Sequence, residues 1–398
     1  AMVFYGSSTR KKRMTVDQSL NIAELHRLAK KRLPRVVFDY IAGGAEDEIG
    51  LGENAAAFSA YKLLPRFLTA CGAINLETTL FGKRHALPFG IGPTGIAGLF
   101  HPDGDRLLAV AALQSNIPYI MSGTSSAAIE DLSPESAKNA WYQLYTGRDT
   151  KTDEDIVRRA RDAGMETLVL TVDSEVRTKR ERDLHNGFFA PRLKLSLLLE
   201  ALTHPAWVAG YIRNGGRPPF GNFARYAGGN TNHATQTFMM GHLPGLPTWA
   251  DVARYRKLWP GALVIKGLLD PEDAKRAVEH GVNGIIVSNH GGRNLDRAPS
   301  SLAMLPVIRE AVGKDMTLIF DSGIRRGSDI ITALCLGAQF VLLGRATLYG
   351  LAAGGLPGAR KAIEILRQEV ETNGRQMGCA DIAAFDRSRI VTQGRRCP

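Results

Sequence analysis

Short apolar runs alternate with amphipathic segments along most of the chain from about residue 85. The runs are expected to be buried β-strands, and the segments between them carry apolar residues at helical spacing. The expected strands are Leu87–Gly92, Pro118–Ser122, Trp141–Tyr145, Thr167–Val172, Leu263–Lys266, Gly284–Ser288, Thr317–Asp321 and Phe340–Leu343. Strands that alternate with helices indicate βαβ units and a parallel sheet. Eight such strands predict an α/β fold, the TIM (β/α)8 barrel.

Helices are expected between these strands and at both ends of the chain. Those with clear boundaries are Asp153–Ala163, Pro271–His280, Ser301–Val312 and Ser328–Leu336. Asp270 and Asp329 stand where helix starts favour capping side chains and acids. We expect one domain over residues 1–398, with a barrel core at about residues 85–355. A helical segment precedes this core, and a C-terminal helix covers Leu356–Met377.

A long insertion, about residues 187–247, is expected after the fourth strand, where an ordinary loop is much shorter. Apolar runs lie among cations here, and only Glu200 opposes these charges between residues 188 and 230. The runs and cations are Leu195–Leu199, Trp207–Ala209, Tyr211–Ile212, Arg192, Lys194, Arg213, Arg217 and Arg225. Such a segment is typical of an element on an anionic membrane surface. A lid over the active site is the alternative, and the two are compatible because different parts of the insertion can serve each role.

Charge and cysteine content narrow the range of partners. The chain has 398 residues and a formal net charge of +11, but its basic residues are spread out and accompany no nucleic-acid-binding motif. We therefore expect no nucleic acid partner and attribute the charge to anionic lipid, cofactor and substrate. Four separated cysteines form no Cys-x-x-Cys pair, so we expect no disulfide and no metal site, and a reducing compartment.

The expected location is cytoplasmic, peripheral on the inner face of the cell membrane. The basic stretch Ser7–Arg13 is not followed by the apolar core of a secretory signal. No run approaches the roughly 18 uninterrupted apolar residues that a spanning helix needs.

The segment Ser288-Asn289-His290-Gly291-Gly292-Arg293 directly follows the apolar run Gly284–Val287. His290 can take a proton from a carbon or hydroxyl, and Arg293 can hold a carboxylate beside it. The alternative to this catalytic role is a polar turn after the strand, in which His290 has only a structural, capping role. The other strand ends favour the catalytic interpretation.

Polar residues or glycines end every expected strand, and in a TIM barrel such positions face the active site. They are Pro93, Thr94, Gly95, Ser122, Gln143, Tyr145, Thr171, Asp173, Lys266, Ser288, His290, Asp321, Gly344 and Arg345. This convergence is not expected from core packing. It predicts one polar site at one end of the barrel.

Two glycine-rich turns follow the last two strands, Asp321–Gly327 and Leu343–Arg345. Their backbone amides can approach an oxyanion, and Arg325 and Arg345 add positive charge, as in the phosphate site of many TIM barrels. No Gly-x-Gly-x-x-Gly opens a βαβ unit, so NAD is disfavoured. FMN suits both the polar mouth and the phosphate site.

The chain resembles the FMN-dependent L-2-hydroxy acid oxidases and dehydrogenases over about residues 22–382. The motifs that carry the resemblance are Phe38–Tyr40, Gly43–Asp47, Gly92–Gly95, Gln143–Tyr145, Ser288–Arg293 and Asp321–Gly327. Arg180–Asn186 and Gly344–Ala353 are most similar to members that oxidise mandelate. Leu202–Pro205 and Asn214–Pro218 are similar to membrane-bound lactate-oxidising members.

The resemblance implies a role for each site residue. His290 would be the catalytic base with Asp173 beside it, and Lys266 would stabilise the reduced flavin. The implied substrate ligands are Tyr40, Tyr145, Arg180 and Arg293. The implied FMN ligands are Pro93, Thr94, Gly95, Ser122, Gln143, Thr171, Lys266 and Ser288 for the ring or ribityl chain, and Asp321, Gly323, Arg325, Gly344 and Arg345 for the ribityl and phosphate.

Two positions depart from the oxidases of the family. Gly123 stands where a flavin-contacting serine is found in plant members, and Gly95 stands where oxidases commonly carry alanine. The resemblance therefore implies a dehydrogenase that oxidises an (S)-2-hydroxy acid with an aromatic, mandelate-like side chain and passes electrons to a membrane quinone. An oxidase that uses oxygen and releases hydrogen peroxide is the alternative. An FMN-dependent isomerase is disfavoured, because Arg180, His290 and Arg293 together suit a hydroxy acid. A basic lipid- or RNA-binding protein is disfavoured, because the cluster of polar residues at the strand ends would then be accidental.

The resemblance also implies that the protein is a homo-oligomer, a tetramer of this chain. Its implied partners are a small 2-hydroxy acid, a quinone or oxygen as electron acceptor, and an anionic membrane surface.

Overall fold

The computed structural model describes residues 14–188, 195–229, 231–392 and 395–396. The expected cations Arg192 and Lys194, the basic stretch Ser7–Arg13 and Cys397 lie outside the described residues.

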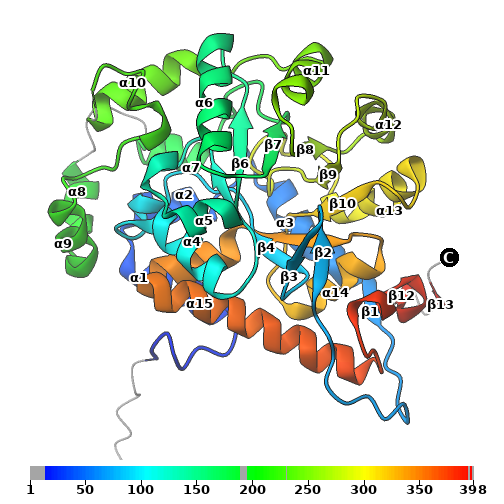
Figure 1. Cartoon of the computed structure of the whole chain (residues 1–398). Coiled ribbons are helices and arrows are strands. Elements are labelled where there is room, and N and C mark those ends of the chain that lie inside the picture. The colour runs from blue at the N-terminus through cyan, green and yellow to red at the C-terminus, as the bar shows by residue number, and fades with distance from the viewer. Residues whose placement is uncertain (1–13, 189–194, 230, 393–394, 397–398) are drawn as a thin grey trace, which may run out of the picture.

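Eight parallel strands close into a barrel in the order β10-β11-β4-β5-β6-β7-β8-β9, which confirms the TIM barrel (Figure 1). Each expected strand is present, with ends shifted by a few residues at most. The strands are β4 (Phe89–Ile91), β5 (Tyr119–Ser122), β6 (Ala140–Tyr145), β7 (Thr167–Thr171), β8 (Ala262–Leu268), β9 (Gly284–Val287), β10 (Thr317–Phe320) and β11 (Phe340–Leu343).

Amphipathic helices surround the barrel and bury their apolar faces against it. They are α4 (Gly104–Gln114), α5 (Pro134–Asn139), α6 (Thr150–Asp162), α11 (Trp249–Leu258), α12 (Pro271–Glu279), α13 (Ser301–Val312), α14 (Gly327–Cys335) and α15 (Arg345–Gln376). The expected helix starts are confirmed, because Asp270 accepts a hydrogen bond from the Glu272 amide and Asp329 accepts one from the Arg326 amide. Gly354 and Gly355 interrupt α15 with non-helical backbone angles, so its second half begins close to the expected Leu356.

The N-terminal segment is helical, as expected, and consists of α1 (Ile22–Arg32), α2 (Arg35–Ala42) and α3 (Ile49–Ala56). Helix α1 packs along α15 (Figure 1). Short 3-10 helices are η1 (Ala57–Ala60), η2 (Ala97–Leu99), η3 (Ile129–Asp131), η4 (Gly221–Phe223), η5 (Ile382–Ala384) and η6 (Arg387–Arg389).

Two small sheets lie outside the barrel, and the sequence pattern did not predict them. One is β1 (Tyr61–Leu63) with β12 (Ile390–Thr392) and β13 (Arg395–Arg396). The other is the hairpin of β2 (Thr78–Leu80) and β3 (Lys83–His85), which brings Leu80 and Phe81 against the barrel interior. A Cβ on Gly284, at the start of β9, would lie 2.9 Å from Phe81, so the hairpin covers the amino-terminal end of the barrel.

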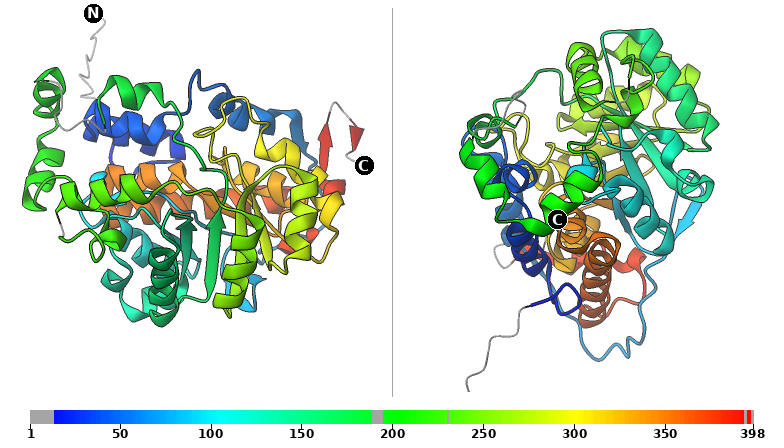
Figure 2. Two further views of the ribbon diagram at one scale, coloured as in Figure 1. Left: turned by 90° about the horizontal axis from the view of Figure 1, so that it is seen from above. Right: turned by 90° about the vertical axis from the view of Figure 1, so that its left-hand side faces the viewer.

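The described part of the insertion, about residues 187–247, contains the α-helices α8 (Leu195–Ala201), α9 (Pro205–Arg213) and α10 (Asn232–His242), and the short helix α7 (Glu181–His185) precedes it. Helices α8 and α9 stand away from the barrel at one side of the molecule, next to α1 (Figures 1 and 2). Together with the turn between them, they expose large apolar side chains, including Leu195, Leu199, Leu202 and Ile212. No helix in the described ranges combines the length and apolar content that a membrane crossing requires.

Candidate active site

A cavity of about 1030 Å³, counting its opening, lies at the carboxyl ends of the barrel strands. Most of the predicted site residues line it, although the first and last of them, Tyr40 and Arg345, are far apart in the chain. They are Tyr40, Pro93, Thr94, Gly95, Tyr145, Thr171, Arg180, Lys266, His290, Arg293, Asp321, Gly323, Arg325, Gly344 and Arg345. The structure therefore brings together residues predicted from the strand ends with residues, such as Tyr40 and Arg180, that the resemblance implied.

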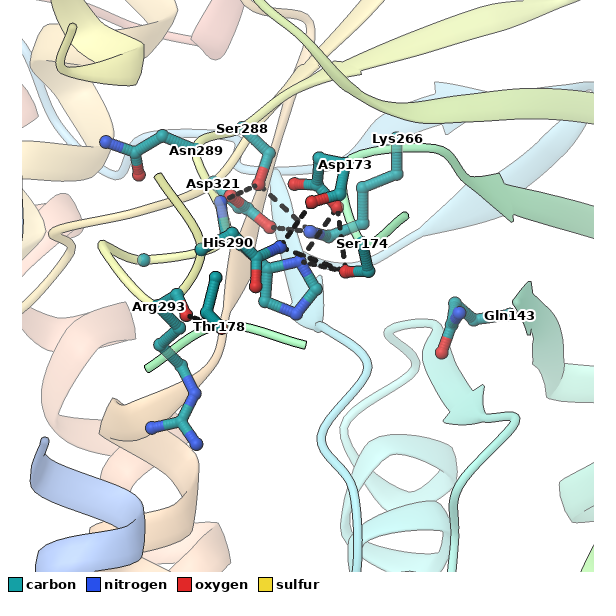
Figure 3. A network of polar contacts seen from close by, with 12 residues as sticks. Gln143, Asp173, Ser174, Thr178, Lys266, Ser288, Asn289, His290, Arg293 and Asp321 are labelled. Atoms are coloured by element: carbon teal, nitrogen blue, oxygen red, sulfur yellow. Dashed lines mark hydrogen bonds and ion pairs between the residues drawn. The ribbon is translucent and has the colours of Figure 1, made fainter. Parts of the chain in front are cut away.

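Lys266 is a buried cation at the floor of this cavity, only 4% exposed. Its Nζ donates to Ser288 Oγ at 2.9 Å and lies 3.3 Å from Asp321 Oδ2 (Figure 3). Burial alone would lower the pKa of Lys266, but the attraction of Asp321 and Asp173 outweighs it, so the pKa is raised. Lys266 therefore carries a fixed positive charge at neutral pH, where it can stabilise negative charge on a bound group.

His290 and Asp173 form a pair beside Lys266, with 2.9 Å between His290 Nδ1 and Asp173 Oδ1 (Figure 3). Burial lowers the pKa of His290, and repulsion from Lys266 and Arg180 adds to this, while Asp173 opposes it. Burial would raise the pKa of Asp173, but His290 and Lys266 outweigh it and lower the pKa. The pair is therefore a neutral imidazole oriented by a carboxylate, which is the arrangement of a general base.

Backbone geometry places this pair. His290 adopts a left-handed φ of 58°, a strained conformation that is found most often at functional sites. On the neighbouring strand β8, Gly267 has a φ of 108°, and a Cβ there would lie 2.5 Å from Asp173 Cγ. The glycine thus makes room for the Asp173 carboxylate next to His290.

Four arginines surround the same cavity, namely Arg180, Arg293, Arg325 and Arg345. Burial, together with repulsion between these cations, lowers the pKa of Arg293 to about 10 and that of Arg345 to about 9. Both remain charged at neutral pH. Buried like charges are costly unless anions balance them, so this cluster favours anionic ligands.

The end of α2 fixes two of these guanidinium groups. Arg293 donates to the carbonyl oxygens of Tyr40 and Gly43 at 2.8 and 2.9 Å. Arg345 donates to the carbonyls of Ile41, Gly43 and Gly291 at 2.8 to 3.0 Å. Cations are favoured at a helix C-terminus, where carbonyls lack helical partners. The N-terminal segment therefore positions the cationic part of the site.

Three buried polar side-chain atoms near the cavity have no hydrogen-bond partner within the described residues. They are Thr94 Oγ1, Gln143 Nε2 and Thr171 Oγ1. A buried polar group left unpaired costs about 1–3 kcal/mol. A flavin ring offers the carbonyl oxygens and ring nitrogens that would pair with them, so these side chains fit FMN.

The two glycine-rich turns border the cavity on another side. Gly323 has a φ of 88°, and a Cβ there would lie 2.3 Å from the carbonyl oxygen of Asn54, so only glycine fits. A Cβ on Gly344 would meet nothing within 4 Å, which leaves its backbone open to the cavity. With Arg325 and Arg345 beside them, these turns can hold the FMN phosphate.

Four predicted site residues lie behind the cavity wall rather than on it, namely Ser122, Gln143, Asp173 and Ser288. Ser122 Oγ and the Gly123 amide both donate to Gln143 Oε1 at 3.2 Å. These bonds orient the Gln143 amide and leave its Nε2 for a ligand. Ser122 thus supports Gln143, and its own contact with FMN stays a prediction.

The cavity also contains residues that the sequence analysis did not single out. Thr124 lies two positions after the predicted Ser122, and Ser322 lies one position after the predicted Asp321. A search that continued one or two residues beyond each strand end would have found both. Ile41, Phe100 and Leu348 are apolar, and no sequence signal marks them as parts of a site.

A second cavity adjoins the first and shares Tyr40, Thr124, Tyr145, Arg180 and His290 with it. Burial raises the pKa of Tyr145 to about 12, so its hydroxyl stays protonated and can donate to a substrate. The rest of the wall is largely apolar. It includes Ile96, Val176, Leu184, Phe220, Met239, Met240, Leu243 and Pro244.

The end of α10 supplies Met239, Met240 and Leu243 to this wall, and buried contacts hold it in place. His242 Nε2 lies 2.9 Å from Asp153 Oδ1 on α6. Arg177 donates to the carbonyl oxygens of Met240 and Leu243. One end of the insertion therefore completes the second cavity, as the lid interpretation expects.

Comparison with known proteins identifies the family of the chain. The family model described as FMN-dependent dehydrogenase matches residues 29–392. The chain belongs to this family, and it is an FMN-dependent oxidoreductase that acts on 2-hydroxy acids.

Individual relatives are similar over nearly the whole chain. An (S)-mandelate dehydrogenase of Pseudomonas putida is 39% identical over 375 residues and 94% of each chain. An L-lactate dehydrogenase of Acinetobacter baylyi is 40% identical over 367 residues, 91% of this chain and 95% of that protein. The crystal structure of the monotopic membrane protein (S)-mandelate dehydrogenase has a TM-score of 0.89 at 38% identity and covers 94% of this chain and 100% of that chain. A mandelate oxidase structure has a TM-score of 0.79 at 34% identity, with 95% and 100% coverage.

Proposed function

We propose that the protein oxidises an (S)-2-hydroxy acid with an aromatic side chain to the 2-oxo acid and passes the electrons to a quinone. The main evidence for an aromatic substrate is the second cavity, whose largely apolar wall lies beside His290, Tyr145 and Arg180. A methyl or hydrogen side chain would leave most of this cavity unfilled, whereas an aromatic ring would be desolvated in it. The (S)-mandelate dehydrogenase relative supports the same substrate class.

In this proposal the protein side chains bind the substrate and move one proton. Arg180 and Arg293 bind the carboxylate, and Tyr40 and Tyr145 hydrogen-bond the carboxylate or hydroxyl. His290 accepts a proton from the substrate, and Asp173 stabilises the imidazolium that results. Bound FMN, when present, accepts the two electrons of the oxidation. Lys266 holds the positive charge that compensates the negative charge this creates.

The substrate test is anaerobic bleaching of the flavin absorbance by a panel of 2-hydroxy acids. Mandelate and other aryl acids should bleach it at lower concentration than lactate or glycolate. Replacement of Met239 by tryptophan should narrow the second cavity and weaken mandelate oxidation while lactate oxidation persists. Equal rates with mandelate and lactate in the native protein would overturn the aromatic assignment.

The acceptor is tested in the second half of the cycle. Reduced enzyme should be re-oxidised much faster by a quinone than by air, with little hydrogen peroxide released. Fast peroxide formation in air would instead support the oxidase, a class that also occurs among the structural relatives.

We further propose that the insertion places the enzyme on an anionic membrane surface at the inner face of the cell membrane. The exposed side chains of Leu195, Leu199, Leu202 and Ile212, close to Arg213, support this proposal. A Gly/Ser linker in place of residues 188–230 should abolish sedimentation with anionic vesicles. High salt should partly release the native protein, because each cation near the surface contributes about 1 kcal/mol. A native protein that never binds such vesicles would leave only the lid role.

The implied homotetramer is a separate proposal. Light scattering of the purified holoenzyme should give the mass of four chains, and a monomer mass would reject it.

A further inference from the structure

A third cavity, of about 860 Å³ with its opening, lies between α9 and the barrel. We call it the α9 cavity. Its wall comes from α9, from the end of α1, from the region of η2 and the start of α4, from the segment between β5 and the end of η3, and from the segment before η4. The residues that would contact a ring are Arg32, Leu99, Ala206, Trp207 and Tyr211. The cavity is also lined by charged side chains that already have protein partners: Asp103 with Arg106, Asp105 with the Ser126 amide, and Asp131 with the Ala128 amide.

One layer of backbone separates the α9 cavity from the FMN cavity. Gly95 and Phe100 line the FMN cavity, whereas Gly98 and Leu99 line the α9 cavity. Likewise, Thr124 lines the FMN cavity, whereas Ser126 lines the α9 cavity. Because adjacent Cα atoms are only about 3.8 Å apart, neighbouring residues that face opposite cavities make a thin common wall. A small-molecule electron acceptor bound in the α9 cavity would therefore lie close to the flavin.

The walls of this cavity suit a flat ring with carbonyl oxygens. Trp207 and Tyr211 stack on each other with 4.7 Å between ring centroids, and they offer aromatic surface. Trp207 Nε1 donates to the Leu99 carbonyl oxygen at 2.9 Å, which fixes the indole against the common wall. Arg32 Nε is buried and has no hydrogen-bond partner in the part of the chain that the structure describes. Arg32 also lines the cavity, where its guanidinium group can donate to a ligand carbonyl.

Helix α9 also connects the cavity to the apolar outer surface of the insertion. Trp207 and Tyr211 face the cavity, whereas Ile212 on the same helix is 69% exposed and Leu202 just before it is 66% exposed. A ligand that partitions into lipid could reach the cavity from the surface that these side chains form.

We propose that the α9 cavity binds the ring of a lipid-borne quinone and is the site where the reduced enzyme is re-oxidised. The proposal rests on the proposed function, because that function supplies the electrons. Per turnover, the substrate loses the hydrogens of its Cα–H and O–H bonds and gains a C=O bond. The quinone receives the two electrons through the flavin and takes up two protons, so two O–H bonds form and a quinol leaves.

The test uses the FMN-loaded full chain, reduced without oxygen by photoreduction, so that it does not depend on any substrate. Re-oxidation is followed in stopped flow with a benzoquinone that carries one prenyl unit, and separately with ferricyanide, a small anion that needs no ring pocket. Ala206→Phe fills the α9 cavity. Ala209→Phe makes the same change on α9 at a position that does not line the cavity.

Ala206→Phe should slow re-oxidation by the quinone about tenfold or more, because extra volume in a formed pocket excludes the ring. Ferricyanide re-oxidation and flavin bleaching by mandelate should stay within about twofold of the native rates, as should every rate of Ala209→Phe. Arg32→Leu should raise the quinone concentration needed for half-maximal rate, and Arg32→Lys should restore part of the loss.

Equal quinone rates in Ala206→Phe and Ala209→Phe would overturn the proposal. So would inhibition of quinone re-oxidation by a saturating 2-oxo acid in both variants, since the quinone would then enter through the substrate cavity. Failure of every hydroxy acid to bleach the flavin would reject the proposed function alone, because the quinone measurement starts from photoreduced enzyme.

Discussion

The interior of the barrel and its mouth are built by the same strands, yet their chemistry is opposite. Side chains two positions apart on a strand point to the same side, so each inward-facing residue is followed by another one nearer the mouth. The interior layer is apolar and consists of Ile120, Trp141, Val169, Val264, Ile286, Ile319, Phe340 and Leu342, with Leu80 from the hairpin. Two positions beyond seven of these stand Ser122, Gln143, Thr171, Lys266, Ser288, Asp321 and Gly344.

A single step along each strand therefore separates a packed core from a charged site. The interior is stable by itself, since its side chains fill space with each other. The mouth contains a buried lysine, unpaired polar atoms and clustered arginines, which are stable only with partners and anions. We therefore expect substitutions in the interior layer to change the stability of the fold and substitutions two positions further along a strand to change the chemistry of the site.

The largest expected effect on the chemistry comes from His290→Gln. The variant should bind FMN and unfold like the native protein, but reduction of the flavin by substrate should slow by about 10²–10⁴-fold, the usual contribution of a general base. Stopped-flow absorbance measures it. A near-native rate would show that His290 is not the base.

The matched change in the interior is Ile286→Ala, four positions earlier on the chain. It should lower the free energy of unfolding by about 2–5 kcal/mol, because it leaves a cavity in the core. Flavin reduction by substrate below the unfolding temperature should change little. Thermal unfolding and stopped flow on the same sample check this, and lost chemistry in a folded, FMN-loaded variant would contradict the separation of the two layers.

Arg293→Lys should weaken substrate binding and turnover by about 10–100-fold, because an ammonium cannot reproduce bidentate recognition of a carboxylate. The amide of the substrate should likewise be poor with the native enzyme. If the acid and its amide react equally well, the carboxylate clamp is not part of this site.

The pH dependence of flavin reduction should follow His290. Its neutral form is the base and its pKa is lowered, so the rate should be constant through neutral pH and fall on acidification only below the ordinary value of 6.5. Asp173 raises the pKa of His290 by attraction. Asp173→Asn should therefore move this acid limb to still lower pH and reduce the plateau, because a weaker base remains. An acid limb that moves to higher pH would contradict the pairing.

The smallest expected effect is that of Gly95→Ala. Its new Cβ would lie 2.7 Å from Thr124 Oγ1, so the Thr124 side chain, which lines the FMN cavity, must shift. FMN should remain bound, with re-oxidation by oxygen faster or reduction by substrate slower by a few-fold, on the order of 1 kcal/mol. Stopped-flow measurement of both half-reactions decides it. Unchanged rates would mean that Gly95 does not set the choice of acceptor.

Local pattern was enough to find the barrel and the floor of its site. Apolar runs of strand length gave eight correct strands, and polar residues at the ends of these runs gave Lys266, His290 and Asp321 at the mouth. Both follow from periodicity, because a strand that enters the core must be apolar and its carboxyl end must emerge at the mouth.

Tertiary structure alone decided the rest. Two arginines of the cluster, Arg293 and Arg345, are fixed by carbonyl oxygens at the end of α2, and Arg345 bonds to Ile41 across 304 positions in the chain. The apolar wall of the second cavity and the α9 cavity combine the insertion with segments that no local pattern links to it. The small sheet of β1 and β12 joins strands from the two ends of the chain. The sequence by itself determined which residues a strand presents, because that depends on near neighbours. The shape of each cavity depends on contacts between distant segments, and these exist only in the folded chain.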